Sequence, residues 1–236
     1  MPDVAFPVRE RLRNVWLFAE LSEAELDELE RVTQRRTFHR GSIIVQQGDS
    51  ADTNFYCVHQ GHLKVTTCDA NGSELWINLL RPGCHVGEIA LLDGKPRSAT
   101  VTGLDRGELL SIRHADFHRL VKTGLASGVG MRLLRTMATR VRHLTDRVHD
   151  SGALPVFKRV AKQLNELADL VGTHVDAKRV ILNVKLSQQD LGDMVHATRE
   201  SVNKCMRALA NKGIIRRTGG RIDILDRPRL RALIAA

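Results

Sequence analysis

The sequence predicts an α+β chain with an N-terminal antiparallel β domain, a long amphipathic helix and a C-terminal winged helix-turn-helix. Three observations predict this fold class. Glycines recur at even intervals in the first half of the chain, apolar residues recur at steps of three and four after residue 127, and two short capped helices precede a glycine hairpin near the C-terminus. These patterns are typical of strands joined by turns, of a heptad helix and of a winged helix-turn-helix.

Length and composition indicate a globular protein of two modest domains. The chain has 236 residues, of which 42% are hydrophobic and 27% charged, so each domain can bury a core. No apolar run approaches the ~18 to 20 residues that span a bilayer, and the N-terminus lacks the apolar core of a secretory signal. We therefore expect a cytoplasmic protein without a membrane partner.

The residues that usually hold metals or perform catalysis form no recognisable group. Cys57, Cys68, Cys84 and Cys205 are scattered without a Cys-x-x-Cys pair, which indicates reduced thiols rather than a disulfide framework or a zinc site. We expect no metal. The sequence contains no nucleophile elbow, metal triad or paired acid and base, so we predict no catalytic residue and no enzymatic activity.

The first predicted elements are a helix and a series of strands. Residues 22–32 form a helix that begins at Ser22, with Leu26 and Leu29 on one face. Strand-like stretches follow at 42–48, 54–61, 62–68 and 74–80, and four of the glycines around them, at 61, 72, 83 and 94, are eleven residues apart. Evenly spaced turns of this kind predict an antiparallel sandwich or barrel.

The segment from Gly87 to Ala99, GEIALLDGKPRSA, has the residue types of a binding site for a phosphate joined to a sugar. Gly87 lets the backbone approach a ligand, and the apolar helix after it directs N–H groups at an anion. Arg97 supplies positive charge and Ser98 a hydroxyl donor, whereas Glu88 can only accept hydrogen bonds and suits a ribose hydroxyl. The alternative is an ordinary turn with a surface salt bridge between Glu88 and Arg97.

A heptad helix follows the β region. Its seam recurs at steps of three and four, and its other faces carry Arg132, Arg135, Arg140 and Arg142. Such a seam favours a partner helix, although a helix packed on its own domain fits the spacing equally well. Residues 151–155, SGALP, then predict a hinge. The seam consists of Leu134, Met137, Val141, Leu144 and Val148.

Positive charge is concentrated in the last third of the chain. The net charge is +9, and from Pro155 to the end there are 16 Lys and Arg against 8 Asp and Glu. A basic segment attracts polyanions because their condensed counterions are released on binding. A solvated basic surface without a partner is the alternative.

Two short helices and a hairpin are predicted in this basic region. Ser187 and Asp190 form a capping box for the first helix, and Thr198 caps the second, which ends at Gly213. A hairpin around Gly219 and Gly220 completes a winged helix-turn-helix. The second helix is the natural major-groove reader, and its outward face carries Arg199, Glu200, Asn203, Lys204 and Arg207.

Glu200 has two possible roles. A carboxylate on a face that meets phosphates is unfavourable unless a base, such as cytosine through its N4 amine, donates a hydrogen bond to it. This favours a role for Glu200 in reading a base. An acid that stabilises the helix N-terminus without DNA is the alternative.

Both motifs resemble those of the CRP/FNR superfamily of bacterial transcription regulators. The Gly-Glu, apolar turn and Pro-Arg-Ser-Ala of residues 87–99 are similar to the family's phosphate-binding cassette, and Thr-Arg-Glu-Ser-Val at 198–202 is similar to the Ser-Arg-Glu-Thr-Val of its cyclic AMP-responsive branch. The resemblance implies a jelly-roll-like cyclic-nucleotide-binding domain at 1–125, a dimerisation helix at 126–150, a hinge at 151–155 and a winged helix-turn-helix domain at 156–236.

The resemblance also implies an allosteric effector, cyclic AMP first and cyclic GMP second. The family has an arginine beside the cassette glutamate where Arg140 stands, and a threonine-serine pair that recognises adenine where Leu144 and Thr145 stand. Leu144 lacks a hydroxyl, which weakens the expectation of strict adenine selectivity. The implied ligand-binding residues are Val86, Gly87, Glu88, Ile89, Ala90, Arg97, Ser98, Ala99, Arg140, Leu144 and Thr145.

The implied partners are a second copy of the chain, double-stranded DNA with an inverted-repeat operator, and RNA polymerase. By position, Arg199 and Glu200 read a G and a neighbouring C in a TGT-like half-site, and Lys204 replaces an arginine of the relative. Lysine lacks the guanidinium fork, so one base step is read less strictly. The implied DNA-binding residues are Ser187, Gln188, Thr198, Arg199, Glu200, Ser201, Asn203 and Lys204.

Two other functions stay open at this point. A cyclic-nucleotide-controlled regulatory subunit of an enzyme would need no DNA reader, so the winged helix disfavours it. The second is a regulator on the same scaffold that either needs no effector or senses haem or redox state. The first cysteine is Cys57, whereas iron-sulfur members carry an N-terminal cysteine cluster, and His114 and His118 are expected to be surface residues.

Overall fold

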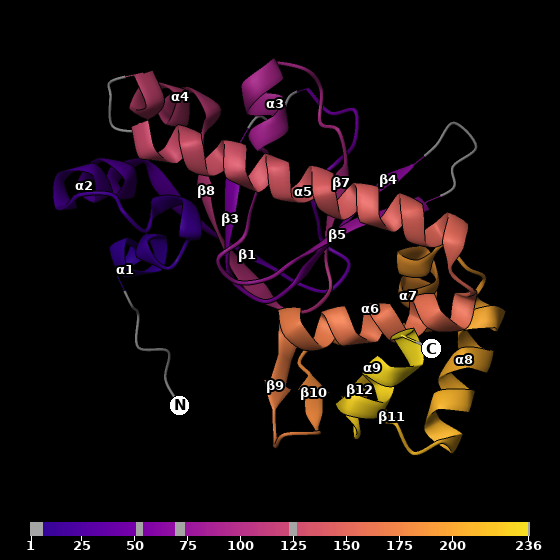
Figure 1. Ribbon diagram of the computed structural model, residues 1–236. Helices are drawn as coiled ribbons and strands as arrows, with labels where there is room; N and C mark the ends of the chain where they lie inside the picture. The colour runs from indigo at the N-terminus through magenta and orange to yellow at the C-terminus, as the bar shows by residue number, and fades with distance from the viewer. Residues whose placement is uncertain (1–6, 51–53, 69–73, 123–126, 236) are drawn as a thin grey trace. The chain divides into compact units, whose positions relative to one another are not determined.

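The computed structural model describes residues 7–50, 54–68, 74–122 and 127–235 (Figure 1). The chain divides into two compact units, one formed by Met1–Thr67 and Asn78–Arg142 and the other by Cys68–Ile77 and His143–Ala236. Along the chain, three elements cross from one unit to the other: strands β4 (Leu63–Cys68) and β5 (Glu74–Leu80), and helix α5 (Ser127–Ala153).

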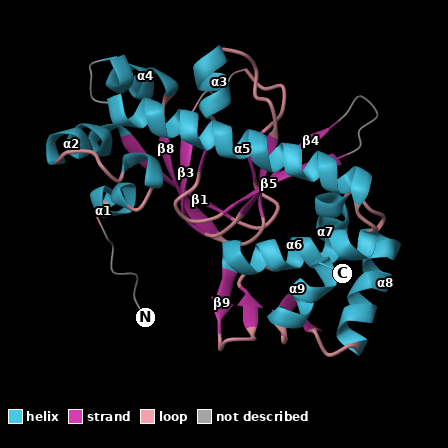
Figure 2. Ribbon diagram, in the orientation of Figure 1, coloured by secondary structure: helices cyan, strands magenta, loops and turns pink. Residues whose placement is uncertain are grey.

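The first unit is built on two four-stranded sheets, ordered β1-β8-β3-β6 and β2-β7-β4-β5 (Figure 2). All described strand pairings in them are antiparallel. This confirms the predicted antiparallel sandwich, and β2 to β5 lie within the four predicted stretches. The remaining strands are β1 (Thr33–Phe38), β2 (Ile43–Val45), β3 (Phe55–Gln60), β6 (His85–Val86), β7 (Thr100–Gly103) and β8 (Gly107–Ile112).

Helices close the core of this unit. The Phe55 ring lies 4.7 Å from that of Phe117 and 6.3 Å from that of Phe18, measured between centroids, and Val129 and Leu133 of α5 are buried in the same cluster. The first turns of α5 are therefore part of this core. The other helices are α1 (Val8–Arg13), the 3-10 turn η1 (Trp16–Phe18), α2 (Glu23–Val32), α3 (Glu88–Asp93) and α4 (His114–Lys122).

Arg132, which the heptad pattern places on a face of α5 other than the seam, is buried in the first unit. Its side chain is buried, donates to the carbonyl of Trp16 at 2.9 Å and forms an ion pair with Glu20. A guanidinium tolerates this position because its donors are satisfied there.

A second charged group lies at the edge of the core. Glu108 of β8 is paired with the buried Arg11, and Nη2 of Arg35 approaches its other carboxylate oxygen at 2.6 Å. Burial tends to raise the pKa of the Glu108 carboxyl, but the hydrogen bonds and charges of the two arginines outweigh it and lower that pKa.

The second unit is a small helical domain with a sheet ordered β11-β12-β10-β9. Helix α6 buries Val160, Leu164 and Leu167 against the inward faces of the neighbouring helices. Its elements after α5 are α6 (Val156–Val171), β9 (Gly172–His174), β10 (Val180–Leu182), α7 (Gln188–Val195), α8 (Arg199–Asn211), β11 (Ile215–Thr218), β12 (Arg221–Ile224) and α9 (Arg227–Ala235).

The break in the helical pattern that was predicted at residues 151–155 is shorter than expected. Ser151, Gly152 and Ala153 continue α5, and the helical pattern stops only at Leu154 and Pro155. Serine and glycine cost a helix no more than about 1 kcal/mol each, whereas a proline disfavours helical geometry in the residue before it. The break therefore falls at the proline.

In the described part of the chain, no helix is both long and apolar enough to cross a bilayer. Over the same residues, His, Cys, Asp and Glu form no group of three or more that could hold a metal ion.

Candidate functional site

Gly87 links strand β6 to helix α3 in a conformation that favours glycine. Its φ is +103° and its ψ is 0°. A Cβ on this residue would lie 2.7 Å from the carbonyl oxygen of Asn54 and 2.7 Å from Nη1 of Arg97. The backbone at Gly87 is thus held against two polar groups of the protein itself, and its close approach to a ligand stays a prediction.

The Arg97 side chain closes this segment from the other side. It is only 4% exposed, and its guanidinium donates to the carbonyls of Asn54, at 2.5 Å, and of Gly87, at 3.3 Å. A permanent positive charge therefore lies directly beside the start of α3. Ser98, the next residue, is exposed.

Glu88 is buried at 1% exposure and forms an ion pair with Arg140 of α5. Arg140 also donates from its other terminal nitrogen to the carbonyl of His85 at 2.9 Å, so both guanidinium nitrogens hold the side chain in place. The second carboxylate oxygen of Glu88 and Nε2 of His85 are buried and have no hydrogen-bond partner in the described part of the protein. Each atom therefore lacks the partner that a buried polar group normally has, and a carboxylate oxygen is a suitable acceptor for a sugar hydroxyl.

His85 is a site residue that sequence reasoning did not find. Its ring stacks on Phe55 with centroids 5.5 Å apart, and burial together with the nearby charge of Arg140 lowers its pKa to about 3. The imidazole is therefore neutral at physiological pH. No motif signals it, because its place is set by the pairing of β6 with β3.

The predicted ligand-binding residues divide into two groups. The consecutive run from Val86 to Ala90, the segment Arg97 to Ala99, and Arg140 meet in the first unit through the contacts just given. Because Glu88 and Arg97 are both buried, a surface salt bridge between them does not describe this segment. Leu144 and Thr145 are exposed on α5 within the second unit, so their role at the ligand stays a prediction.

The helix-turn-helix is built as predicted. Ser187 and Asp190 form a reciprocal capping box at α7, and Oγ1 of Thr198 accepts the Ser201 N–H at 3.2 Å at the start of α8. Between the helices, His196 has φ +50° and ψ +53°, the left-handed conformation that makes the turn.

One side of α8 is open to solvent. Arg199, Glu200, Lys204 and Arg207 are exposed, whereas Val202 and Leu209 are buried. Asn203 is half-buried and accepts a hydrogen bond from Gln188 at 2.9 Å, which ties the two helices together. The β11–β12 hairpin adds exposed arginines at 216, 217 and 221.

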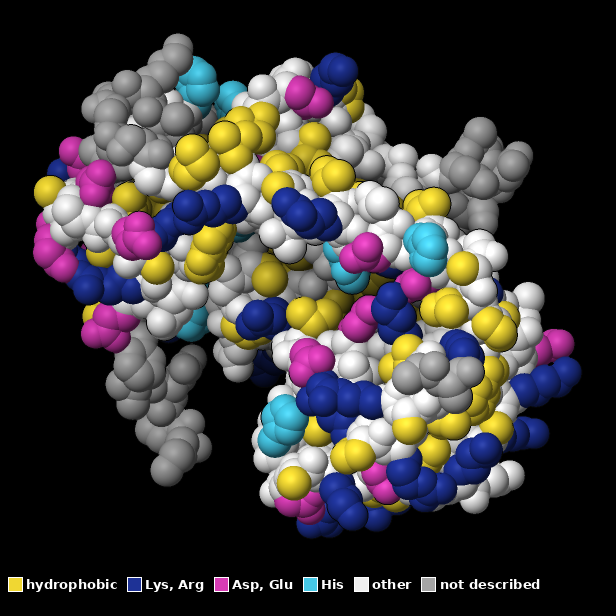
Figure 3. All heavy atoms as spheres, in the orientation of Figure 1, with side chains coloured by type: hydrophobic (Ala, Val, Ile, Leu, Met, Phe, Trp, Pro, Cys, Tyr) yellow, Lys and Arg dark blue, Asp and Glu magenta, His cyan; other side chains and the backbone are white. Residues whose placement is uncertain are grey.

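Figure 3 shows one face of the molecule, on which many Lys and Arg side chains of the C-terminal unit gather. This uneven charge and the outward side of α8 suit a polyanion.

The predicted seam of α5 is exposed. Leu134, Val141 and Val148 are 62%, 62% and 74% exposed, Leu144 is also exposed, and Met137 is half-buried. An apolar stripe of this kind on a described surface is typical of an interaction site.

Comparisons with known proteins match both halves of the chain. A cyclic nucleotide-binding domain model matches residues 35–123, and a Crp-like helix-turn-helix domain model matches residues 158–233. The CRP-like cAMP-activated global transcriptional regulator of Mycobacterium tuberculosis is 27% identical over 221 residues, which cover 94% of this chain and 97% of that protein.

The cAMP-activated global transcriptional regulator Vfr of Pseudomonas aeruginosa is 30% identical over 196 residues, which cover 80% of this chain and 88% of that protein. The structure of FixK2 from Bradyrhizobium japonicum has the same fold, with a TM-score of 0.72 and 22% identity over 87% of this chain and 98% of that one. The relatives from Mycobacterium tuberculosis and Pseudomonas aeruginosa are both named as transcriptional regulators. The two domain models and the full-length similarity show that the chain belongs to the CRP/FNR family of DNA-binding transcription regulators.

Proposed function

We propose that the protein is a homodimeric transcription regulator in which a 3′,5′-cyclic nucleotide controls affinity for an inverted-repeat operator. The observation that carries the proposal is the pair of buried groups beside Gly87. Arg97 offers a fixed positive charge there, and Glu88, held by Arg140, has one buried oxygen without a hydrogen-bond partner among the described residues. A cyclic phosphate joined to a ribose needs both groups.

Each binding residue has a proposed role. Arg97, Ser98 and the backbone from Val86 to Ala90 would hold the cyclic phosphate, and Glu88 would accept from the ribose 2′-hydroxyl. Leu144 and Thr145 would contact the base. Cyclic AMP is the first choice because the names of the relatives describe cAMP activation, and cyclic GMP is the second because Leu144 has no hydroxyl.

The exposed seam of α5 supports a dimer formed by two copies of this helix. In such a dimer the two α8 helices would enter successive major grooves about one DNA turn, ~34 Å, apart. Arg199 and Glu200 would read a G and a neighbouring C, with Lys204 on the next step and Ser187, Gln188, Thr198, Ser201 and Asn203 supporting the contact. RNA polymerase in the cytoplasm is the expected further partner.

Control would be a population shift. A ligand that binds more tightly to the DNA-competent form raises DNA affinity, and DNA raises ligand affinity by the same factor. For this purpose we divide the chain into a nucleotide domain at 1–125, a dimerisation helix from residue 126 to the end of α5, a short hinge at Leu154 and Pro155, and a reader at 156–236.

Titration calorimetry tests the proposal. The pure protein is titrated with cyclic AMP and with cyclic GMP, first alone and then with a saturating labelled palindromic duplex. We expect one nucleotide to bind and its affinity to rise when the duplex is present. Equal operator affinity with and without either nucleotide would contradict the proposal.

A further inference from the structure

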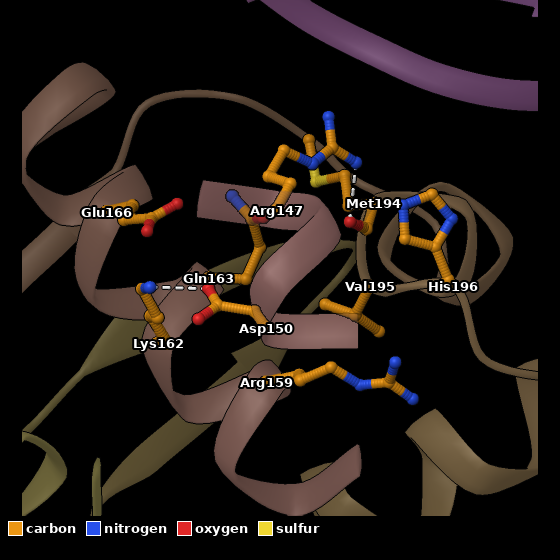
Figure 4. Close-up of a pocket in the computed structure, with 9 residues that line it drawn as sticks. All are labelled: Arg147, Asp150, Arg159, Lys162, Gln163, Glu166, Met194, Val195 and His196. Carbon is orange, nitrogen blue, oxygen red and sulfur yellow. Dashed lines mark hydrogen bonds and ion pairs between the residues drawn. The ribbon is translucent and has the colours of Figure 1, made fainter. Parts of the chain in front are cut away.

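The last turns of α5 pack against α6 and α7 within the second unit, around a small pocket of about 30 Å³ (Figure 4). Charged side chains dominate its lining: Arg147 and Asp150 from α5, and Lys162 and Glu166 from α6. Asp150 and Lys162 form an ion pair. Met194 and His196, at the end of α7, complete the side that faces Arg147.

Arg147 makes two directed contacts with backbone carbonyls. Its Nη2 donates to the carbonyl of Met194 at 2.7 Å, and its Nη1 donates to the carbonyl of Ile77 at 3.0 Å. Met194 lies in the last turn of α7, where helix carbonyls have no partner within the helix. The guanidinium therefore caps the first helix of the helix-turn-helix and, through its other nitrogen, holds strand β5.

The elements that Arg147 joins are those through which the two units are connected. Helix α5, which carries Arg147, runs from the first unit into the second, and strand β5, which carries Ile77, runs from the second unit into the first. Helix α7 packs directly on α8 through buried residues such as Leu191 and Val202. The Arg147 side chain thus joins α5 and β5 to α7, the helix on which α8 packs.

The surroundings of Arg147 keep it charged and directed. Burial lowers the pKa of its guanidinium, and the carboxylate of Glu166 acts against this effect. Burial also raises the pKa of Glu166, in spite of His143, Lys162 and Arg147 nearby. An arginine remains protonated under such conditions, and its planar fork serves two acceptors in fixed directions.

We propose that Arg147 is the positioning residue that couples the nucleotide-dependent state of α5 and β5 to the orientation of the helix-turn-helix. This inference rests on the proposed function, because it requires that nucleotide and DNA binding are coupled. Removing the hydrogen bonds from Arg147 to the carbonyls of Met194 and Ile77 leaves the nucleotide site and the DNA-binding face intact. It lets α7 and α8 take orientations that no longer depend on the position of α5. The coupling then falls, while the affinity for nucleotide alone does not.

The test uses the full-length protein and three variants, Arg147→Met, Arg147→Lys and Arg142→Met. Arg142 is exposed on the same helix, so its replacement removes the same charge without touching Met194 or Ile77. For each protein, calorimetry gives the nucleotide Kd without DNA. Fluorescence anisotropy gives the operator Kd with and without saturating nucleotide, and the ratio of these two values measures the coupling.

We expect Arg147→Met to lower the coupling ratio about tenfold, as is typical for losing a hydrogen-bonded charge, and to leave the nucleotide Kd within about threefold of wild type. Arg147→Lys should give an intermediate ratio, because one ammonium replaces two separate nitrogen donors. Arg142→Met should match wild type.

Three outcomes would overturn the inference: an unchanged ratio in Arg147→Met, an equal fall in Arg142→Met, or, if Arg147→Met does not fold, an unchanged ratio in Arg147→Lys. A wild-type ratio of one contradicts the proposed function itself and removes the coupling that Arg147 would serve. A wild-type ratio well above one that Arg147→Met retains contradicts only the role of Arg147.

Discussion

Replacing Gly87 with alanine should damage the nucleotide site far more than the same change at Gly94. Both glycines bound helix α3 and both have positive φ, +103° at Gly87 and +66° at Gly94. Alanine in such a conformation costs about 1 to 2 kcal/mol at either position. The surroundings differ, because a Cβ at Gly94 meets no atom of the described residues within 4 Å, whereas one at Gly87 lies 2.7 Å from the Asn54 carbonyl oxygen and from Nη1 of Arg97.

The extra cost at Gly87 follows from Arg97. The Asn54 carbonyl directly precedes strand β3 and cannot retreat freely, so the guanidinium must move and weaken its hydrogen bonds to Asn54 and Gly87. Hydrogen bonds from a charged donor are worth about 1.5 to 3 kcal/mol. We therefore expect Gly87→Ala to lower the unfolding free energy by about 2.5 to 5 kcal/mol, against about 1 to 2 kcal/mol for Gly94→Ala.

Urea unfolding at pH 7 measures the stability of both variants, and calorimetry measures their affinity for the cyclic nucleotide. Gly87→Ala should weaken nucleotide binding at least about tenfold, which is 1.4 kcal/mol, and Gly94→Ala should leave it near wild type. If the two variants lose the same stability and bind nucleotide equally, the close packing of Gly87 on Arg97 has no energetic role and the reasoning is refuted.

Three further predictions concern the two binding surfaces and the core. Arg97→Leu should abolish nucleotide-stimulated DNA binding, because it removes the charge proposed for the phosphate, and normal nucleotide affinity by calorimetry would contradict the site. Arg199→Ala should keep nucleotide affinity and lose the preference for the operator over a scrambled duplex in anisotropy titrations, by about 1 to 3 kcal/mol; an unchanged preference would remove α8 from base reading. Glu108→Gln should lower the unfolding free energy by about 2 kcal/mol at pH 7. Since ion pairing lowers the folded-state pKa of Glu108, its contribution is present above the ordinary value of about 4.5 and is lost as the pH falls through the folded-state value. Urea unfolding across pH should therefore show wild type and variant converging in acid, and a difference that does not depend on pH would contradict this assignment.

Local chemistry made much of the fold predictable. The capping residues Ser22, Ser187 and Thr198 begin helices where expected, because a side-chain oxygen in that position satisfies a free N–H of the first turn. The turn at His196 and the hairpin at Gly219 were likewise predictable from neighbouring residues. The end of α5 was not, because serine and glycine tolerate a helix more readily than their usual presence in loops suggests.

The candidate site was predictable only in part. The run from Gly87 to Ala90 and Arg97 form a local motif, but the partner of Glu88 came from family resemblance, since 52 residues separate it from Arg140. Nothing in the sequence indicates the Asn54 carbonyl that holds Arg97, or the Met194 carbonyl that holds Arg147, because any residue supplies a backbone oxygen. The burial of Arg132 was missed for a similar reason, as its acceptor is the carbonyl of Trp16.

Arg140 and Arg147 are seven positions apart on helix α5. Arg140 forms the ion pair with Glu88, and Arg147 donates to the carbonyl of Met194. At 3.6 residues per turn this spacing is within about 20° of two full turns, so both arginines leave the helix in nearly the same direction, about 10 Å apart along its axis. Gaining or losing one residue between them would swing one arginine by about 100° relative to the other. The number of residues in this stretch therefore sets the direction of one arginine relative to the other on α5.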